Sequence, residues 1–151
     1  VDLRSPPHYI LTFLQTLKPH VKAIVQNISS SHSNTVVGLV LDVFCAPLID
    51  VASDLGIPSY SYMPSNVGFL NLMFSLRKGE DGDVFNDSNP QWLIPGLPDP
   101  VPSSVLPDAV FNKEGGYATY YKLAQRFKDS KGIIVNSFSG MEQYAIDALC
   151  D

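Results

Sequence analysis

Asp42 is the strongest candidate in this sequence for a residue with a chemical role. It directly follows the apolar run at residues 36–41. An uninterrupted run rich in Val and Leu is typical of a strand that is covered on both faces of a parallel sheet. A carboxylate at the end of such a strand is costly to bury unless it finds a partner. Asp42 could cap the helix that follows, as Asp often does at turns, or it could orient a catalytic or ligand-binding group.

Hydrogen-bonding side chains follow two further strand-like runs in the same way. Ser65 and Asn66 come after the second run, and Asn136 and Ser137 come after the third. In open parallel sheets, ligands bind outside the carboxyl ends of the strands. The sequence therefore predicts a ligand-binding edge that carries a carboxylate, hydroxyls and amides.

The elements that must position these residues indicate an α/β fold with parallel strands and helices on both faces of the sheet. Strands are expected at residues 36–41, 59–63 and 133–135, and Ser65 or Asn66 is expected to cap a helix. Apolar spacing predicts further helices at residues 7–27, with a kink or break at Pro19, and at 46–55, 117–128 and 141–149. Residues 77–88 should form a surface loop. Residues 89–107 should lack regular structure and be held to the body by Trp92, Leu93, Ile94 and Leu97.

The composition limits the possible partners. The chain has 151 residues, enough for one domain with a core, and a net charge of −5, which argues against a nucleic-acid partner. No run is long and apolar enough for stable membrane insertion. The two cysteines, Cys45 and Cys150, lack metal-ligand spacing and suit reduced thiols in a reducing compartment, so a cytoplasmic protein is expected.

The sheet that the pattern predicts is thin for this architecture, because only three strands can be placed. The chain also begins with Val1 rather than Met. We therefore expect a piece of a longer protein, with further strands upstream.

Three stretches carry a resemblance to a known family. They are VVGLVLDVFCAPLIDVASDLGIPSYSYMPSNVGFLNL, IPGLP at residues 94–98 and KGIIVNSF at residues 131–138. These stretches resemble the plant family 1 UDP-dependent glycosyltransferases, which glycosylate small secondary metabolites. The resemblance implies a GT-B fold of two facing Rossmann-like domains, in which the amino-terminal domain binds the acceptor. Residues 1–151 would be a partial amino-terminal domain, and the first strands and the carboxy-terminal donor domain would lie outside the chain.

The resemblance assigns a catalytic role to Asp42. In the family, a His near the amino terminus takes the proton of the acceptor hydroxyl, and an Asp at a strand end holds that imidazole; Asp42 matches this Asp. An oriented carboxylate fixes the tautomer of an imidazole and stabilises its charged form. Because His8, His20 and His32 do not match the catalytic His, the base should lie outside the chain, and the isolated chain should be inactive. The reaction inverts the anomeric carbon and needs no metal or other cofactor, because the UDP-sugar is a co-substrate.

Other site residues follow from the same resemblance. Phe44, Phe69 and Met73 match positions near the acceptor, although Met73 could equally be a core residue. A Thr or Ser that meets the donor sugar in the family is replaced here by Pro64, which has no hydroxyl and no backbone N–H. Ser65, the next residue, is the candidate substitute.

Two further features match ordinary structure better than catalysis. Glu142 matches a Glu of the family and is interpreted as a helix residue rather than a catalyst. The tyrosines Tyr117, Tyr120 and Tyr121 could line a pocket, but their spacing is more typical of an amphipathic packing helix.

The predicted function is transfer of a sugar, expected to be glucose, onto a hydroxyl of a flavonoid, another phenolic or a triterpenoid. The expected partners are these small molecules and a UDP-sugar, and the protein is expected to be a monomer. A non-catalytic small-molecule binding module is the alternative. A hydrolase with Ser65 or Ser137 as nucleophile is disfavoured because the sequence has no G-x-S-x-G motif. A self-contained nucleotide site is disfavoured because the sequence has neither a G-x-G-x-x-G motif nor a P-loop.

Overall fold

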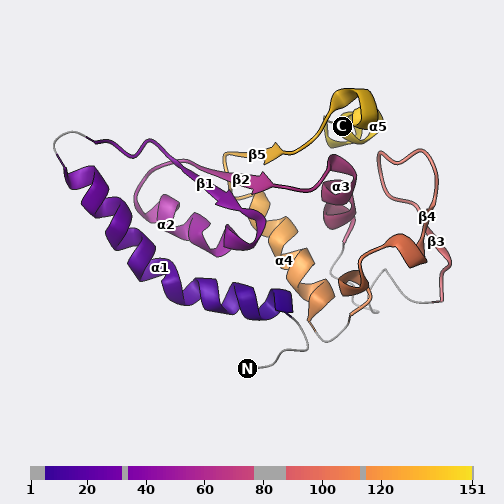
Figure 1. The fold of residues 1–151 in the computed structure, drawn as a ribbon, viewed down its shortest axis with the longest axis horizontal. Helices are drawn as coiled ribbons and strands as arrows, with labels where there is room; N and C mark the ends of the chain where they lie inside the picture. Colours follow the sequence, from indigo (N-terminus) through magenta and orange to yellow (C-terminus); the bar gives the residue numbers. More distant parts are fainter. Residues whose placement is uncertain (1–5, 32–33, 77–87, 113–114, 151) are drawn as a thin grey trace.

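The centre of the protein is a three-stranded parallel sheet. Its strands β1 (Leu39–Asp42), β2 (Ser59–Met63) and β5 (Gly132–Val135) lie in the order β1-β2-β5. The computed structural model describes residues 6–31, 34–76, 88–112 and 115–150 (Figure 1). All three predicted strands are present, and both pairings are parallel as predicted.

Strand β1 departs from its predicted bounds. It begins only at Leu39, and Asp42 is its last residue instead of the residue beyond its end. Asp42 pairs in register with Tyr62 of β2. Because backbone pairing continues through Asp42, the sheet itself fixes the direction in which this carboxylate leaves the chain.

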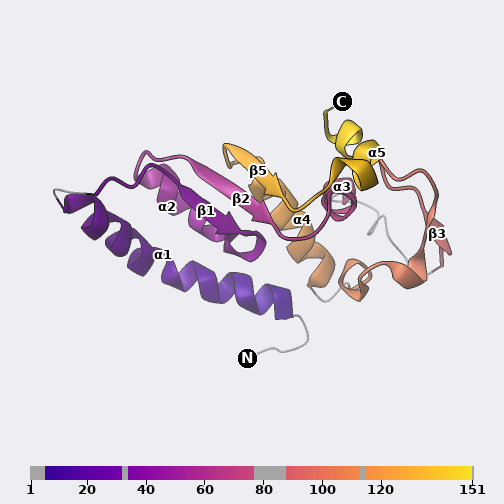
Figure 2. The same ribbon diagram turned by 45° about the horizontal axis from the view of Figure 1, so that its top comes forward.

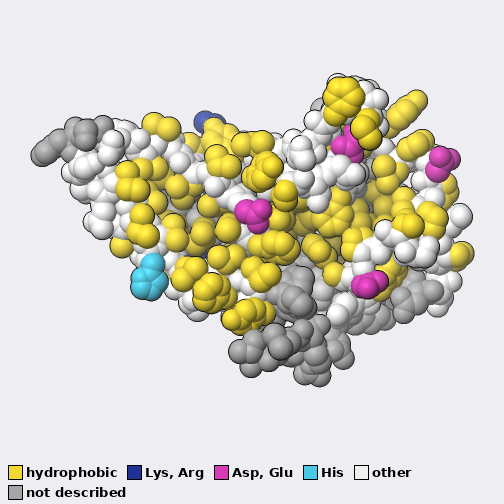
Figure 3. Space-filling view, viewed as in Figure 1, with side chains coloured by type: hydrophobic (Ala, Val, Ile, Leu, Met, Phe, Trp, Pro, Cys, Tyr) yellow, Lys and Arg dark blue, Asp and Glu magenta, His cyan; other side chains and the backbone are white. Residues whose placement is uncertain are grey.

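The two faces of the sheet differ in burial, because successive side chains of a strand point to opposite faces. Leu41 and Met63 point to one face and are buried. Val40, Tyr62 and Ile134 point to the other face and are 64%, 38% and 44% exposed. Figure 3 shows hydrophobic side chains crowded over the region of the sheet and the first helix, with few charged side chains among them.

Helical segments cover the buried face of the sheet. The 3-10 helix η1 (Val43–Leu48) and helix α2 (Ile49–Asp54) contact the strands, and helix α4 (Gly116–Phe127) adds Phe127 to the same core. Helix α1 (Pro6–Ser30) packs outside them on η1 and α4 (Figures 1 and 2). Within the described residues, the exposed face has no comparable cover.

The helices agree with the sequence patterns except in detail. Helix α1 is one continuous helix with Pro19 inside it, not two shorter ones, and it bends near its middle (Figure 1). The helix predicted at residues 46–55 is a 3-10 helix followed by a short α-helix. Helix α3 (Val67–Ser75) follows its predicted cap, and helix α5 (Ser139–Cys150) begins earlier than predicted.

An ion-pair cluster joins three of these helices. Asp50 of α2 accepts hydrogen bonds from Lys18 of α1, at 2.5 Å, and from Arg126 of α4. The Lys18 hydrogen bond lowers the pKa of the Asp50 carboxyl, and Arg126 acts in the same direction, while partial burial opposes them. With the Asp50 carboxyl ionised, the cluster therefore stabilises the packing of α1 and α4 against α2.

The segment from residue 88 to 112 has more regular structure than the sequence predicts. Strands β3 (Gln91–Trp92) and β4 (Val101–Pro102) form a short antiparallel ladder, and two 3-10 turns follow, η2 (Ser103–Val105) and η3 (Asp108–Val110). Ile94 is buried, and Trp92 and Leu97 pack against the same cluster, as predicted. Leu93, by contrast, lies just beyond β3 and is 82% exposed, so the prediction that it holds this segment to the body is wrong. Of the predicted loop at residues 77–88, residues 77–87 lie outside the described residues.

Gly96 allows this segment to dock on α3 and α5. It has φ +75°, and a Cβ at this position would lie 2.7 Å from the Ala145 Cα atom and 2.7 Å from the Asn71 Nδ2 atom. We expect Gly96→Ala to lower the free energy of unfolding by about 3 kcal/mol, since it adds a steric clash to an unfavourable φ. Urea unfolding of the protein that contains this chain would measure the change.

Gly56→Ala is the matched control for this prediction. Gly56 also has a positive φ, +66°, but nothing lies within 4 Å of an added Cβ. The loss should therefore be about 1 kcal/mol, from the backbone alone. Equal losses for the two variants would contradict the close packing at Gly96.

Candidate functional site

Asp42 lies at the carboxyl edge of the sheet with one of its two carboxylate oxygens in use. Its Oδ1 atom accepts a hydrogen bond from the backbone N–H of Phe44, at 3.1 Å, and so caps η1. The side chain is exposed, and within the described residues the Phe44 amide is the only hydrogen-bond partner that its carboxylate has. The capping role is therefore real, and the Oδ2 atom is left open to a further donor.

The turn between β2 and α3 places Ser65 at the same edge. Of the two predicted caps, Asn66 is the one used: its Oδ1 atom accepts a hydrogen bond from the Phe69 N–H at 2.9 Å. The Ser65 side chain is exposed and makes no hydrogen bond to any described residue. No described residue therefore occupies the Ser65 hydroxyl, which can meet a ligand at this edge.

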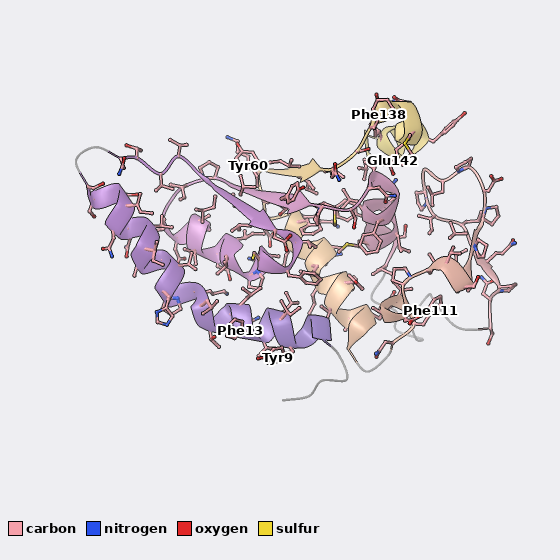
Figure 4. All side chains as sticks on the ribbon, in the orientation of Figure 1. Tyr9, Phe13, Tyr60, Phe111, Phe138 and Glu142 are labelled. Carbon is pink, nitrogen blue, oxygen red and sulfur yellow. The ribbon has the colours of Figure 1, made fainter. Side chains whose placement is uncertain are left out.

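Asn136, which follows β5, and Glu142 of α5 bind the β2–α3 turn from the other side, and Ser137 binds Glu142. The Asn136 N–H donates to the Met63 carbonyl at 3.0 Å, and its Nδ2 atom donates to the Pro64 carbonyl at 3.3 Å. Helical geometry is interrupted at Glu142, with φ −125° and ψ 25°. Figure 4 shows Glu142 between α5 and α3.

The Glu142 carboxylate occupies the amino terminus of α3. Its Oε2 atom accepts from the Val67 N–H at 3.2 Å and its Oε1 atom from the Gly68 N–H at 3.1 Å. The Ser137 hydroxyl donates to Oε2 at 2.6 Å. Partial burial raises the pKa of the Glu142 carboxyl, but the hydrogen bonds from Ser137, Gly68 and Val67 outweigh it, so this pKa lies below its ordinary value.

Glu142 lies in helix α5, as the sequence predicted, but its contacts with α3 were not predicted. The side chain connects segments 74 and 75 residues apart, so no local pattern could have shown this contact. The one signal was indirect: a carboxylate is favoured at the first turn of a helix, where free N–H groups gather.

A hollow of about 680 Å³ lies beside this cluster. Asn66, Asn136, Ser137 and Glu142 line its polar side. The exposed hydrophobic side chains of Phe138, just before α5, and of Met141 and Tyr144 in α5 line another part. The remaining lining residues are Gly96, Leu97, Pro98 and Ala145. Asn66, Asn136 and Ser137 of the predicted polar edge thus border a space that is large enough for a small molecule, whereas Asp42 and Ser65 do not line it.

The three predicted acceptor residues lie in different surroundings. Phe44 and Phe69 are partly buried, and the Phe69 ring meets the Tyr120 ring edge to face, with centroids 5.8 Å apart. Met73 is 1% exposed inside the core. The packing interpretation of Met73 therefore describes its place here, and only the two phenylalanines reach toward the surface.

The three tyrosines lie on helix α4, which packs against the core. Tyr117 is buried, and Tyr120 and Tyr121 pack against the same cluster of hydrophobic residues. Burial raises the pKa of the Tyr120 hydroxyl. This agrees with the amphipathic interpretation of these residues.

Several other candidate groups are absent from this edge. His20 is exposed on α1, and the described residues contain no cluster of three His, Cys, Asp or Glu side chains that could hold a metal. Burial raises the pKa of the Cys45 thiol, and the nearby Asp42 carboxylate raises it further. This cysteine is therefore mostly protonated. No helix among the described residues has the length and hydropathy of a membrane span.

Comparisons with known proteins give the context for this geometry. No protein-family profile matches the chain. UDP-glycosyltransferase 71E1 of Stevia rebaudiana is 41% identical over 97% of the chain, and UDP-glucosyltransferase 102 of Panax ginseng is 39% identical over 96%. The chain covers 32% of each of these proteins and so spans about a third of the length of the curated relatives it matches.

Solved structures give the same result for the fold. UGT71G1 of Medicago truncatula, complexed with UDP-glucose, superposes with a TM-score of 0.85 and 59% identity, over 97% of this chain and 32% of that one. A UDP-glucosyltransferase of Polygonum tinctorium capable of glucosylating indoxyl superposes with a TM-score of 0.85 and 28% identity, over 99% and 35%. These neighbours are GT-B glycosyltransferases, so the predicted Rossmann-like α/β fold class is confirmed.

The hydrogen bonds of the Glu142 carboxylate predict a pH-dependent contribution to stability. Because its pKa is lowered by folding from an ordinary value of 4.5, the contribution is complete above that value and is lost as the pH falls through the folded-state pKa. Glu142→Gln should lower the free energy of unfolding by about 1 kcal/mol at pH 7, since the group is partly exposed. Urea unfolding at a series of pH values should show the difference from wild type shrinking below pH 4.5.

Asp147→Asn is the control for the loss of a carboxylate from α5. Asp147 is exposed, and among the described residues its carboxylate accepts a hydrogen bond only from Gln143 of the same helix, at 2.7 Å. Its replacement should change stability little at any pH. A Glu142→Gln difference that stays constant from neutral to acidic pH would show that shape, not charge, matters at this position.

Proposed function

We propose that this chain, which belongs to the plant UDP-glycosyltransferases, forms part of an enzyme that transfers a sugar from a UDP-sugar to a hydroxyl of a small plant metabolite. The proposal concerns a whole protein, because the curated relatives are about three times as long as this chain. Glucose is the proposed sugar, and flavonoids, other phenolics and triterpenoids are the proposed acceptors. One relative of the chain is a putative UDP-glucose flavonoid 3-O-glucosyltransferase of Fragaria ananassa, 34% identical over 93% of this chain. Its name supports glucose as the sugar and a flavonoid as the acceptor.

The observation that carries the proposal is the geometry of Asp42. This carboxylate ends a central-sheet strand, is exposed at the carboxyl edge, and uses only Oδ1 to cap η1. An imidazole N–H could bind the Oδ2 atom without breaking that cap. The carboxylate would then hold the imidazole in one tautomer and stabilise its positive charge as it takes the acceptor proton.

The reaction would be a single inverting displacement. The imidazole, from a residue outside this chain, removes the proton of the acceptor hydroxyl while that oxygen attacks the anomeric carbon of the sugar. The bond from the anomeric carbon to the phosphate oxygen breaks, and UDP leaves with the bonding electrons. Asp42 acts through the imidazole, and the exposed Ser65 hydroxyl is the proposed contact to the sugar.

We assign residues 1–151 to the amino-terminal, acceptor-binding domain, with the first strands and the donor domain in the rest of the protein. The exposed apolar face of the sheet, with Val40, Tyr62 and Ile134, supports this assignment because such a face is normally covered in a parallel sheet. The whole protein is proposed to be a cytoplasmic monomer that does not bind nucleic acid.

Asp42→Asn in the full-length protein is the first test of this function. Asn still caps a helix, so η1 should remain intact, but it carries no charge to stabilise an imidazolium. Turnover with UDP-glucose and a flavonol should fall by about a hundredfold or more, with an unchanged melting temperature. Steady-state kinetics and thermal unfolding measure the two quantities.

Asp54→Asn is the matched control, because Asp54 is an exposed carboxylate whose only ion-pair partner in the described part of the chain is Lys22, at 2.7 Å. It should leave turnover unchanged. Wild-type turnover in Asp42→Asn would exclude the catalytic role of Asp42. A wild-type protein that binds the flavonol but transfers no sugar would favour a non-catalytic binding module.

A further inference from the structure

We propose that Glu142 is a positioning residue for glycosyl transfer: from α5 it holds the β2–α3 turn at the place where the Ser65 hydroxyl meets the donor sugar. This inference rests on the proposed function. It assigns a task in the reaction to a residue that itself touches neither substrate. The residue acts through the turn that it holds.

The β2–α3 turn has few internal means to fix its own position. Pro64 has no backbone N–H to donate, and the Ser65 side chain makes no hydrogen bond to a described residue. Asn66 caps α3 locally, through the Phe69 N–H, but this bond moves with the helix. The position of the turn relative to the sheet therefore depends on contacts from another segment.

The segment after β5 supplies those contacts. Glu142 binds the first two amides of α3, Val67 and Gly68, with one carboxylate oxygen each. Asn136 binds the carbonyl groups of Met63 and Pro64 on the strand side of the turn. The turn is thus held at both ends, with Ser65 between the two points.

The Glu142 carboxylate is itself held in place. The Ser137 hydroxyl donates to its Oε2 atom at 2.6 Å, which leaves the carboxylate less freedom to rotate. The interruption of helical geometry in α5 falls at Glu142, the residue whose side chain reaches α3. A further bond from the Asn71 Nδ2 atom to the Ala145 carbonyl, at 2.9 Å and buried, keeps α3 and α5 together one turn further on.

The arrangement matters for rate because transfer depends on close placement of the reacting groups. A displacement of about 1 Å at such a site can cost about a hundredfold in rate. A simple capping role for Glu142 predicts only lower stability. A positioning role predicts in addition that the effect of Glu142 on the donor sugar passes through Ser65.

A double-mutant cycle in the full-length protein separates the two roles. UDP-glucose and a flavonol are the substrates, and the variants are Glu142→Gln, Ser65→Ala and the two combined. Each single change should lower kcat/KM for UDP-glucose by about tenfold. The double variant should be no worse than the more impaired single variant, because a misplaced turn has nothing more to lose once the hydroxyl is absent.

Hydrogen exchange supplies a readout that does not depend on activity. Peptides that span residues 64–69 should exchange faster in Glu142→Gln than in wild type, since two amide hydrogen bonds are weakened. Ser137→Ala, which keeps the carboxylate and removes one of its three donors, should give a smaller change in both exchange and kcat/KM. Asp147→Asn should match wild type in both.

The outcomes distinguish this inference from the function on which it rests. Losses that multiply in the double variant, an unchanged kcat/KM in Glu142→Gln, or an unchanged kcat/KM in Ser65→Ala would each overturn the positioning role. A wild-type protein that transfers no sugar would instead overturn the proposed function. If Glu142→Gln fails to fold, the cycle is run with Ser137→Ala in its place. The same comparison of the double variant with the single variants then decides between the two roles.

Discussion

The parallel pairing of β2 with a neighbour on each side is the constraint on which the rest of the structure depends. Because the three strands run in the same direction, the chain leaves all of them at one edge and must return each time through a covering segment. Asp42, the β2–α3 turn and Asn136 mark the three exits. Residues that lie far apart in the sequence therefore meet at one edge, and the polar groups gathered there are a consequence of the topology.

Glu142 shows how one exit becomes the support of another. The amino terminus of a helix presents unpaired N–H groups and a partial positive charge, which a carboxylate satisfies. Here the carboxylate arrives from α5 instead of from the helix's own cap, so α3 and α5 are held together at their first turns. Gly96, packed against both helices, extends this contact to the segment that follows β3. These contacts tie α3, α5 and the segment after β3 together beside the edge where the proposed reaction takes place.

Much of this fold could be predicted from local patterns. The apolar runs gave the three strands, and the order of strand, helix and strand gave their parallel pairing. Residue type also predicted a cap at Ser65 or Asn66, and the structure shows that Asn66 is the one used. The contacts that build the site could not be predicted in this way. The Glu142 bonds span more than seventy residues, the β3–β4 ladder forms in a stretch rich in Pro, and Asp42 belongs to the strand because of backbone pairing that no side-chain pattern reports.

Asp42 finally shows why a structural and a functional interpretation of one residue need not compete. A carboxylate has two oxygens and about four lone-pair positions. The η1 cap uses Oδ1 alone, and this bond, together with the pairing of Asp42 to Tyr62, fixes the direction of the side chain. A carboxylate that orients an imidazole must itself be oriented, or the entropy of its rotation would oppose each encounter. The capping bond is therefore the support that a catalytic role for the second oxygen would require.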